Sequence, residues 1–266
     1  MNKELVQERF GANAANYVGS TVHAKGASLD GLVNAVQPDS SWVCVDVATG
    51  AGHTAIAFAP HVSHMLATDL TEEMLEQVRK LVKEKGLGNV DTAHADAEAL
   101  PFEDNTFDLV TCRIAPHHFP DIAKFVAESH RVLKPGGKFA LVDNVSPDTS
   151  TTPGFEKGEL AEAAQSYNML EKVRDPSHGR AWTPTEWQDC MTTVGFDVVH
   201  EELLDKAMSF KAWCKNQSVP ADKVPGLADM LRQASPAFAA YIRPVERDDD
   251  DIGFTIIEYL AVAQKA

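Results

Sequence analysis

Five short apolar segments alternate with helix-like segments between residues 42 and 144, and this alternation leaves few folds open to the chain. The segment WVCVDVA at 42–48 is apolar at nearly every position, as expected of a strand buried on both faces of a parallel sheet. Parallel strands need crossover connections, which are usually helical and are right-handed. The pattern therefore predicts a doubly wound α/β sheet whose ligands bind beyond the carboxyl ends of the strands.

The other elements of this region follow from the same signals. Further strands are expected at 64–70, 90–96, 107–115 and 138–144, and helices are expected at 53–59, 71–86 and 121–137. The helix at 71–86 has the clearest ends, because Thr71 suits the N-cap, acidic residues fill the first turn and Gly86 suits the C-cap. We expect residues 42–143 to form a cofactor-binding core that follows an N-terminal helical arm at 1–40.

The pattern becomes irregular after residue 144, where prolines and a glycine interrupt it. We expect a helix at 183–195 and two last strands, 197–204 and 253–264, which pair at one edge and complete a mostly parallel sheet of seven strands. The segments at 147–182 and 205–250 carry enough apolar residues to fold as helical insertions that form a lid. The whole chain, 1–266, is interpreted as a single domain.

The charge of the chain disfavours nucleic acid as a partner. Acidic residues outnumber basic ones 39 to 24, which gives a formal net charge of −15 and a surface that repels phosphate backbones. The four cysteines are far apart, so we expect them to be reduced in a cytoplasmic protein. No segment has the roughly 20 apolar residues of a membrane span, so we expect no such span. No residue spacing suggests a metal site, and Asp248–Asp251 is interpreted as a solvated turn. Homodimer formation is left open.

The segment VDVATGAGH at 45–53 places two glycines directly after the first strand. Gly50 and Gly52 let a ligand approach the backbone closely, and the next helix offers unpaired N–H groups. With Ala55 the segment also fits the pattern G-x-G-x-x-A, so a dinucleotide is one candidate ligand. Asp46 favours a different ligand, because a carboxylate at this point repels a pyrophosphate and suits an ammonium or sulfonium group.

Two further acids lie at the ends of the next strands. Asp69 ends the second strand, where it can accept hydrogen bonds from both hydroxyls of a ribose. Asp96 follows the third strand, where it can accept a hydrogen bond from an adenine amino group. Because the carboxyl ends of parallel strands meet at one edge of a sheet, we expect Asp46, Asp69 and Asp96 to surround one positively charged nucleoside.

Four motifs occur in order along this region: VDVATGAGH at 45–53, ATDL at 67–70, HADAEALPFEDNTFDLV at 94–110 and RVLKPGGKFALVD at 131–143. Together they resemble the successive motifs of the class I S-adenosylmethionine-dependent methyltransferases. The stretch RFGANAANYVGSTVHAKGASLDGL is similar to the N-terminal arm of small-molecule methyltransferases near the ubiquinone and menaquinone C-methyltransferases. The resemblance implies a Rossmann-like fold, S-adenosylmethionine as the cofactor and a small-molecule methyl acceptor.

The resemblance also implies which residues hold the cofactor. Asp69 would bind the ribose, Asp96 and the backbone of Ala97 would contact the adenine edge, and Leu70 and Met74 would lie beside the adenine ring. The residues implied at the methionine part of the cofactor are Asp46, Ala48, Thr49, Gly50 and Gly52. Arg113 would lie near this part or near the reaction centre.

Methyl transfer requires an aligned donor and acceptor, and it requires a base only where the acceptor carries a proton. His117 and His118 follow the fourth strand and are the predicted catalytic residues, because imidazole titrates near neutral pH. The segment RIAPHHF at 113–119 lacks the N-P-P-Y-like element of amide and nucleobase-amine methyltransferases, which favours an oxygen, carbon or sulfur acceptor. The predicted substrate contacts are Tyr17, His23, Asp143, His178 and Arg180.

The leading prediction is therefore methyl transfer to a small molecule. One alternative is a nicotinamide dinucleotide oxidoreductase on a similar sheet, which Asp46 disfavours. Another alternative is an enzyme that binds S-adenosylmethionine only as a fixed positive charge and transfers no methyl group. A role in a quinone pathway is disfavoured, because the ending IIEYLAVAQKA differs from the ending that such enzymes carry.

Overall fold

The structure is a computed structural model that describes residues 3–5, 7, 11, 27–247 and 250–266. These residues form two compact units. The first unit contains the described residues up to Asp143 together with residues 188–202 and 260–266, and the second unit contains residues 144–187 and 203–259. Both segments expected to be insertions, 147–182 and 205–250, fall in the second unit. Most of the expected N-terminal arm lies outside the described residues.

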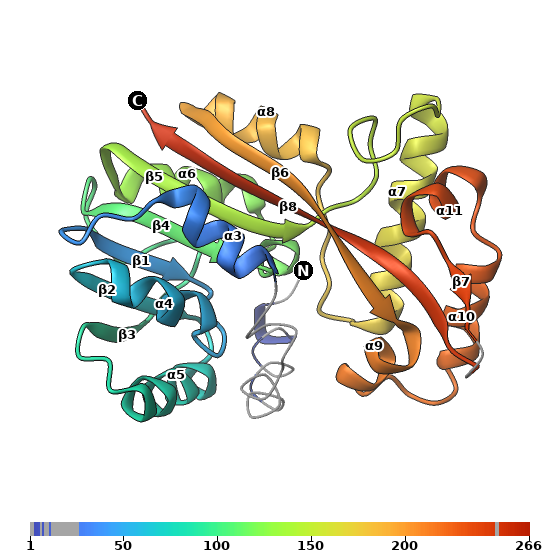
Figure 1. Cartoon of the computed structure of the whole chain (residues 1–266), viewed down its shortest axis with the longest axis horizontal. Helices are drawn as coiled ribbons and strands as arrows, with labels where there is room; N and C mark the ends of the chain where they lie inside the picture. Colours follow the sequence, from blue (N-terminus) through green and yellow to red (C-terminus); the bar gives the residue numbers. More distant parts are fainter. Residues whose placement is uncertain (1–2, 6, 8–10, 12–26, 248–249) are drawn as a thin grey trace. The chain divides into compact units, whose positions relative to one another are not determined.

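The strands form one mostly parallel sheet, as predicted. Its order is β3-β2-β1-β4-β5-β8-β6, with β7 paired to β8. Figure 1 shows the first five strands of this order stacked beside one another, and each neighbouring pair among them is parallel. The bounds are β1 (Val43–Val47), β2 (His64–Asp69), β3 (Val90–His94), β4 (Phe107–Arg113), β5 (Leu133–Asn144), β6 (Phe196–Ser209), β7 (Val245–Glu246) and β8 (Ile252–Lys265).

Within the described residues the sheet has eight strands where seven were predicted, because the two-residue strand β7 pairs antiparallel with the start of β8. So short a strand leaves no periodicity in the sequence. The helix predicted at 121–137 is also shorter, since it ends at Val132 and β5 begins at the next residue. Pro135 has no N–H to continue a helix, and a side chain at Gly137 would come within 2.9 Å of the carbonyl oxygen of Lys134.

The helices of the first unit connect the parallel strands. α5 begins after Thr71 and ends at Gly86, which adopts the left-handed conformation with a φ of 66°. The short helix α4 begins at His53, directly after the glycine loop. The bounds of these elements are α3 (Ala27–Val36), α4 (His53–Phe58), the 3-10 turn η1 (Ala59–His61), α5 (Glu72–Lys85), the 3-10 turn η2 (Pro116–His118) and α6 (Ile122–Val132).

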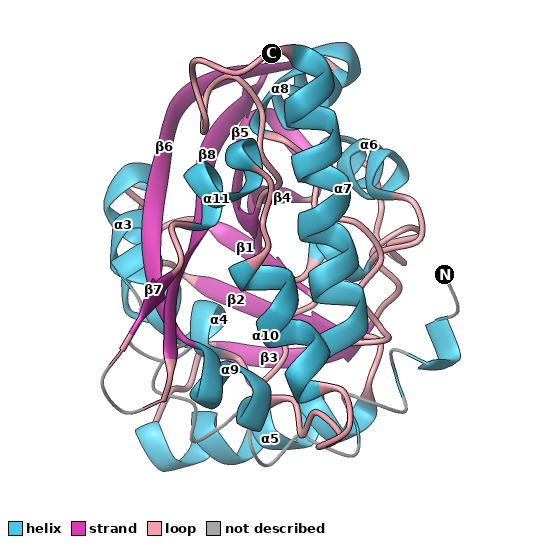
Figure 2. Cartoon of the chain, turned by 90° about the vertical axis from the view of Figure 1, so that its right-hand side faces the viewer, coloured by secondary structure: helices cyan, strands magenta, loops and turns pink. Residues whose placement is uncertain are grey.

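The second unit is mainly helical, and Figure 2 shows its long helix α7 beside α10 and α11. Aromatic residues fill its interior, and the hydroxyl of Tyr241 donates a hydrogen bond to the carbonyl of Val145. The helices that lie wholly in this unit are α7 (Lys157–Arg174), α9 (Phe210–Asn216), α10 (Val224–Arg232) and α11 (Pro236–Ile242). Helix α8 (Pro184–Val194) contains residues of both units.

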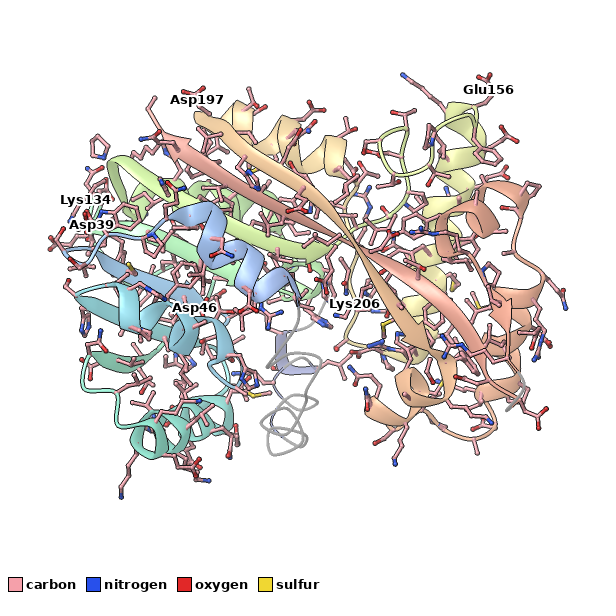
Figure 3. All side chains as sticks on the ribbon, in the orientation of Figure 1. Asp39, Asp46, Lys134, Glu156, Asp197 and Lys206 are labelled. Atoms are coloured by element: carbon pink, nitrogen blue, oxygen red, sulfur yellow. The ribbon has the colours of Figure 1, made fainter. Side chains whose placement is uncertain are left out.

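The core of the first unit lies around the parallel strands. Apolar residues of β1, β4 and β5 are almost completely buried, as the continuous apolar runs of these strands predict. Two acids are buried among them, Asp46 of β1 and Asp143 of β5. Figure 3 places Asp46 in the interior of this unit, whereas Asp39 and Asp197 lie at its periphery. A buried carboxylate requires hydrogen-bond donors, and these donors define the floor of the site described next.

Candidate functional site

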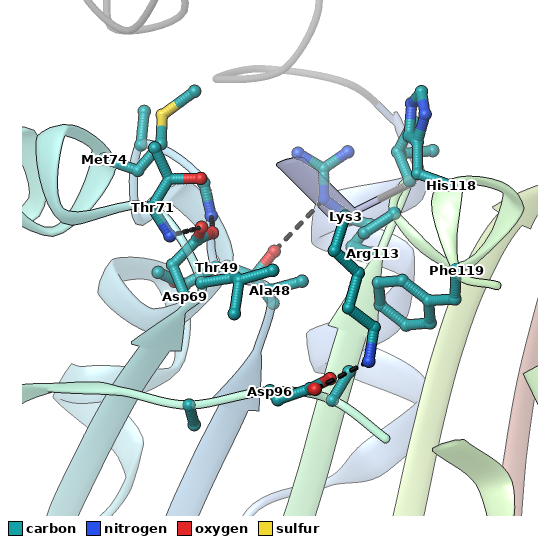
Figure 4. Close-up of a pocket in the computed structure, with 18 of the residues that line it drawn as sticks. Lys3, Ala48, Thr49, Asp69, Thr71, Met74, Asp96, Arg113, His118 and Phe119 are labelled. Carbon is teal, nitrogen blue, oxygen red and sulfur yellow. Dashed lines mark hydrogen bonds and ion pairs between the residues drawn. The ribbon is translucent and has the colours of Figure 1, made fainter. Parts of the chain in front are cut away.

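A pocket in the first unit lies where the parallel strands β1, β2 and β4 end (Figure 4). Its walls come from the loops that follow these strands and from the segment after β3. Nine of the eleven residues predicted to hold a cofactor line it, namely Ala48, Thr49, Gly50, Asp69, Leu70, Met74, Asp96, Ala97 and Arg113. A pocket at this edge is where open α/β sheets bind ligands.

The loop after β1 owes its shape to three residues in the left-handed conformation. The φ angles of Ala48, Gly50 and Gly52 are 53°, 54° and 86°. At Gly52 a Cβ atom would lie 3.0 Å from the side chain of Val78, so glycine is required there for packing against α5. Gly52 is predicted as a cofactor contact, but it does not line the pocket. Its role in the structure is to bring the loop close to α5.

Asp69 joins the glycine loop to the start of α5. One carboxylate oxygen accepts a hydrogen bond from the backbone N–H of Gly50 at 2.9 Å, and the other accepts one from the backbone N–H of Thr71 at 2.9 Å. Burial raises the pKa of Asp69, and these hydrogen bonds oppose the shift. The side chain nevertheless lines the pocket.

Asp46 lies beneath the pocket. It was predicted to contact the ligand, but it is not among the residues that line the pocket. It is 1% exposed, and its two oxygens accept hydrogen bonds from the hydroxyls of Thr49 and Thr111 at 2.5 and 2.6 Å. Burial raises the pKa of Asp46 to about 6, whereas these hydrogen bonds, the charge of Arg113 and the backbone N–H of Ala55 lower it. The carboxylate thus ties the glycine loop to β4 and to the start of α4.

Asp96 lines the pocket, but it is already paired with a residue from the start of the chain. The ammonium group of Lys3 lies 2.6 Å from Oδ2 of Asp96 and 2.7 Å from Glu98, and Lys3 itself lines the pocket (Figure 4). Oδ1 of Asp96 accepts a hydrogen bond from the backbone N–H of Glu98. Partial burial alone would raise the pKa of Asp96, but Lys3 and this hydrogen bond lower it.

The end of β4 supplies a cation and a strained residue. Arg113 lines the pocket, and its Nε donates a hydrogen bond to the hydroxyl of Thr54 at 3.2 Å. Ile114, the next residue, has a φ of 55°, which is a rare conformation for a β-branched side chain. Its backbone N–H is held by the carbonyl of Val142 at 2.7 Å. Strain of this kind costs about 1–3 kcal/mol and tends to occur at functional sites.

The two predicted catalytic histidines take different positions. His118 lines the pocket, together with its neighbour Phe119. His117 does not line it: its Nδ1 lies 2.6 Å from Oδ1 of Asp143, and its backbone N–H donates to Oδ2 of Asp143 at 2.9 Å. The rings of the two histidines are in contact, with centroids 4.3 Å apart. Asp143, predicted as a substrate contact, is completely buried and binds His117 instead.

Four other residues were predicted to contact the substrate, and two of them, His178 and Arg180, are described and do not line this pocket. Tyr17 and His23 lie outside the described residues. His178 and Arg180 belong to the second unit. His178 is buried, with its Nε2 2.9 Å from Oδ1 of Asn168, and Arg180 is ion-paired with Glu186. Both side chains have structural partners within their own unit.

Several pocket residues were not predicted from the sequence. Most of them are neighbours of predicted ones, so the motifs point to their positions. Lys3 has no such signal, because 93 residues separate it from Asp96. The additional residues are Lys3, Ala51, His53, Thr54, Thr71, Ala95, Glu98, Ile114, Ala115, Phe119 and Pro120.

Neither a metal-binding cluster nor a membrane-spanning helix occurs among the described residues. No group of three or more His, Cys, Asp and Glu side chains among the described residues is arranged to hold a metal ion. In the same residues, no helix has both the length and the apolar character needed to cross a membrane.

Comparison with known proteins gives a consistent result. The family model described as "Methyltransferase domain" matches residues 45–141. The uncharacterized methyltransferase YcgJ of Bacillus subtilis is 34% identical over 226 residues, which cover 85% of each chain. A demethylmenaquinone methyltransferase of Listeria monocytogenes is 37% identical over 116 residues, which cover 42% of this chain and 48% of that protein.

Solved structures agree with the sequence relatives. The crystal structure of YcgJ from Bacillus subtilis superimposes with a TM-score of 0.80 at 32% identity, and it covers 90% of this chain and 97% of that one. The described fold is thus shared with a protein that is similar over most of its length.

Proposed function

Because the chain belongs to the class I S-adenosylmethionine-dependent methyltransferases, we propose that it binds S-adenosylmethionine in the pocket of the first unit and transfers the methyl group to a small molecule. The observation that carries this proposal is the distribution of charge in the pocket. Acids lie at the ends of β2 and β3, and a guanidinium lies at the end of β4. A nucleoside attached to an amino acid presents the matching groups.

The acidic side of the pocket fits an adenosine. Asp69 lines the pocket, where its carboxylate would accept hydrogen bonds from the ribose hydroxyls beside those it accepts from the backbone of Gly50 and Thr71. Leu70 and the buried Met74 supply an apolar surface for the adenine ring. Asp96 and the backbone of Ala97 lie on the same side and suit the adenine amino edge.

The other side of the pocket fits the amino-acid part. Arg113 is the cation that would bind the carboxylate, and the hydroxyl of Thr54 fixes its Nε. The left-handed Ala48 and Gly50 expose the backbone of the loop after β1 to the ligand. When bound, S-adenosylmethionine supplies a methyl group on a sulfonium, which is already activated for transfer. The residues of the pocket therefore need only to orient the reactants and exclude water.

The same geometry disfavours a dinucleotide. A pyrophosphate in a glycine loop binds the backbone N–H groups of that loop. Here the N–H of Gly50 is bound to the carboxylate of Asp69, and Asp46 lies directly below the loop. Two negative groups at this place would repel a pyrophosphate. Asp46 would act on a pyrophosphate from below the loop, whereas the sequence predicted that it faces the ligand directly.

A small-molecule acceptor is supported by two observations. The end of the pocket beside β4 is largely apolar, with Ile114, Ala115, Phe119 and Pro120 in its lining. The demethylmenaquinone methyltransferases, which are similar over 116 residues, carry a small-molecule acceptor in their name. We propose an oxygen, carbon or sulfur atom of a small molecule as the acceptor.

Titration calorimetry of the full chain with S-adenosylmethionine, S-adenosylhomocysteine and NAD tests the binding step. We expect the first two to bind in the range of about 1 μM to 1 mM that is usual for enzyme substrates, and NAD not to bind. Binding of NAD alone would contradict the proposal.

Transfer is tested separately by incubation of methyl-labelled S-adenosylmethionine with a panel of acceptors. Binding without release of S-adenosylhomocysteine for any acceptor would support an enzyme that transfers no methyl group.

A further inference from the structure

The carboxylate of Asp143 binds one residue twice. Oδ2 accepts the backbone N–H of His117 at 2.9 Å, and Oδ1 lies 2.6 Å from Nδ1 of the same histidine. An ionised carboxylate only accepts hydrogen bonds, so Nδ1 of His117 is the donor when Asp143 is ionised. The pair of contacts therefore fixes both the orientation and the tautomer of the His117 ring.

This pair of residues is buried. Asp143 is 0% exposed, and a carboxylate without water is stable only where donors surround it. The contact with Nδ1 orients the ring of His117, and that ring packs against the ring of His118 at a centroid distance of 4.3 Å.

His118 extends this arrangement to the pocket. It is the member of the histidine pair that lines the pocket, at the apolar end with Ile114, Ala115 and Phe119. Phe119 is itself fixed by an edge-to-face contact with Phe125 of α6. This geometry is that of a proton acceptor whose position is supported by neighbouring groups. The acceptor is the imidazole of His118 in the pocket, and the supporting groups are the carboxylate of Asp143 and the ring of His117 that it orients.

We infer that His118 accepts a proton from the methyl acceptor, that Asp143 acts through His117 as a positioning residue, and that the acceptor is a hydroxyl compound of the phenol or enol class. This inference rests on the proposed function. A phenol is ionised only near pH ~10, so at neutral pH it gains from a base that removes its proton, whereas an acceptor with a free lone pair and no proton to lose gains nothing.

In the proposed methyl transfer, His118 takes the hydroxyl proton on a ring nitrogen while the acceptor oxygen forms a bond to the methyl carbon. The bond between methyl and sulfur breaks, and its electron pair stays on sulfur. The positive charge thus moves from the sulfonium to the imidazolium of His118. The charged and titratable groups that line the same pocket are Lys3, His53, Asp69, Asp96, Glu98 and Arg113.

The first experiment measures methyl transfer by the full chain from methyl-labelled S-adenosylmethionine to para-substituted phenols of graded acidity. For His118→Gln we expect a loss in kcat of about 100-fold or more, which grows as the phenol becomes less acidic, with the dissociation constant of the cofactor changed less than about twofold. His64→Gln is the matched control, since His64 lies at the start of β2, away from the pocket lining. Equal activity of the two variants, or no transfer to any phenol by a protein that binds the cofactor, would overturn the inference.

The second experiment needs no acceptor. In Asp143→Asn the single carbonyl oxygen of the amide is required by the backbone N–H of His117, so the amide NH₂ faces Nδ1 and favours the other tautomer. We expect ¹⁵N NMR of histidine-labelled protein to show the proton of His117 on Nδ1 in the wild type and on Nε2 in the variant. The same tautomer in both proteins would remove Asp143 from its positioning role. If Asp143→Asn fails to fold, His117→Gln tests the same role by a lower kcat at constant KM for the cofactor.

These outcomes separate the two proposals. Failure of the wild type to bind S-adenosylmethionine in calorimetry contradicts the proposed function itself. Binding and transfer to phenols, combined with full activity of His118→Gln, leaves the proposed function standing and contradicts the assignment of His118.

Discussion

Lys3 and Asp96, 93 residues apart in the sequence, form an ion pair at 2.6 Å inside the pocket. The lysine occupies the carboxylate oxygen that a cofactor amino group would use, and it also contacts Glu98 at 2.7 Å. The start of the chain therefore takes part in the site. It does so at the end where we place the adenine.

We predict that Lys3→Met tightens the binding of S-adenosylmethionine. Removal of the ammonium frees Oδ2 of Asp96, and a partly exposed ion pair is worth at most about 1 kcal/mol, so we expect a gain in affinity of about threefold to fivefold. Titration calorimetry measures it, with the exposed Lys80→Met as the control. Weaker binding by Lys3→Met alone would show that Lys3 holds the ligand instead of competing with it.

We predict that Asp69→Ala weakens the binding of S-adenosylmethionine by about 1–3 kcal/mol, because the ribose hydroxyls lose a charged acceptor. Asp69 also holds the N–H groups of Gly50 and Thr71, so thermal unfolding should be recorded on the same samples. Asp91→Ala is the matched control, because Asp91 is largely exposed on β3. An unchanged affinity in Asp69→Ala would exclude this carboxylate from the site.

A third prediction concerns stability and pH. Burial raises the pKa of Asp46 to about 6, above the value near 3.8 of a free aspartate. Between these two pH values the folded state keeps the proton and the unfolded state loses it, so this group makes the protein less stable as the pH rises from about 4 to about 6. The expected size is about 2–3 kcal/mol for Asp46 alone, at about 1.36 kcal/mol per pKa unit.

Urea unfolding of the wild type and Asp46→Asn at pH values from 4 to 7 checks this prediction. Other carboxylates, such as Asp96 and Glu128, have lowered pKa values and change the stability in the opposite sense. The difference between the two proteins isolates Asp46. It should shift in favour of Asp46→Asn as the pH rises, and a difference that is constant with pH would contradict the raised pKa.

A fourth prediction concerns the strained residue beside Arg113. Ile114 has a φ of 55°, where any side chain with a Cβ is unfavourable. Ile114→Gly and Ile114→Ala both remove most of the side chain and differ mainly in this strain. We therefore expect the glycine variant to be about 1 kcal/mol more stable than the alanine variant, as measured by urea unfolding. Greater stability of the alanine variant would show that the left-handed conformation is not retained.

The order and type of the elements could be predicted because they depend on local signals. The apolar runs of β1, β4 and β5 and the capped helix α5 are visible in the sequence, since burial on both faces and helix ends impose residue types at short spacing. The same holds for Asp69 and Asp96, whose place at strand ends brings them to one edge of a parallel sheet.

The direction of each side chain depended on contacts between distant segments, which no local pattern contains. Asp46 does not line the pocket because Thr49 and Thr111 bind both of its oxygens, and Thr111 is opposite Asp46 only through the register of β1 with β4. His117 and Asp143 are 26 residues apart and meet because each lies near the carboxyl end of neighbouring strands, β4 and β5. The sequence by itself thus determined the order of strands and helices and which residues reach the edge of the sheet. The tertiary structure decided which of those residues face the pocket and which hold its walls, because strand register and buried hydrogen bonds are properties of the packed sheet.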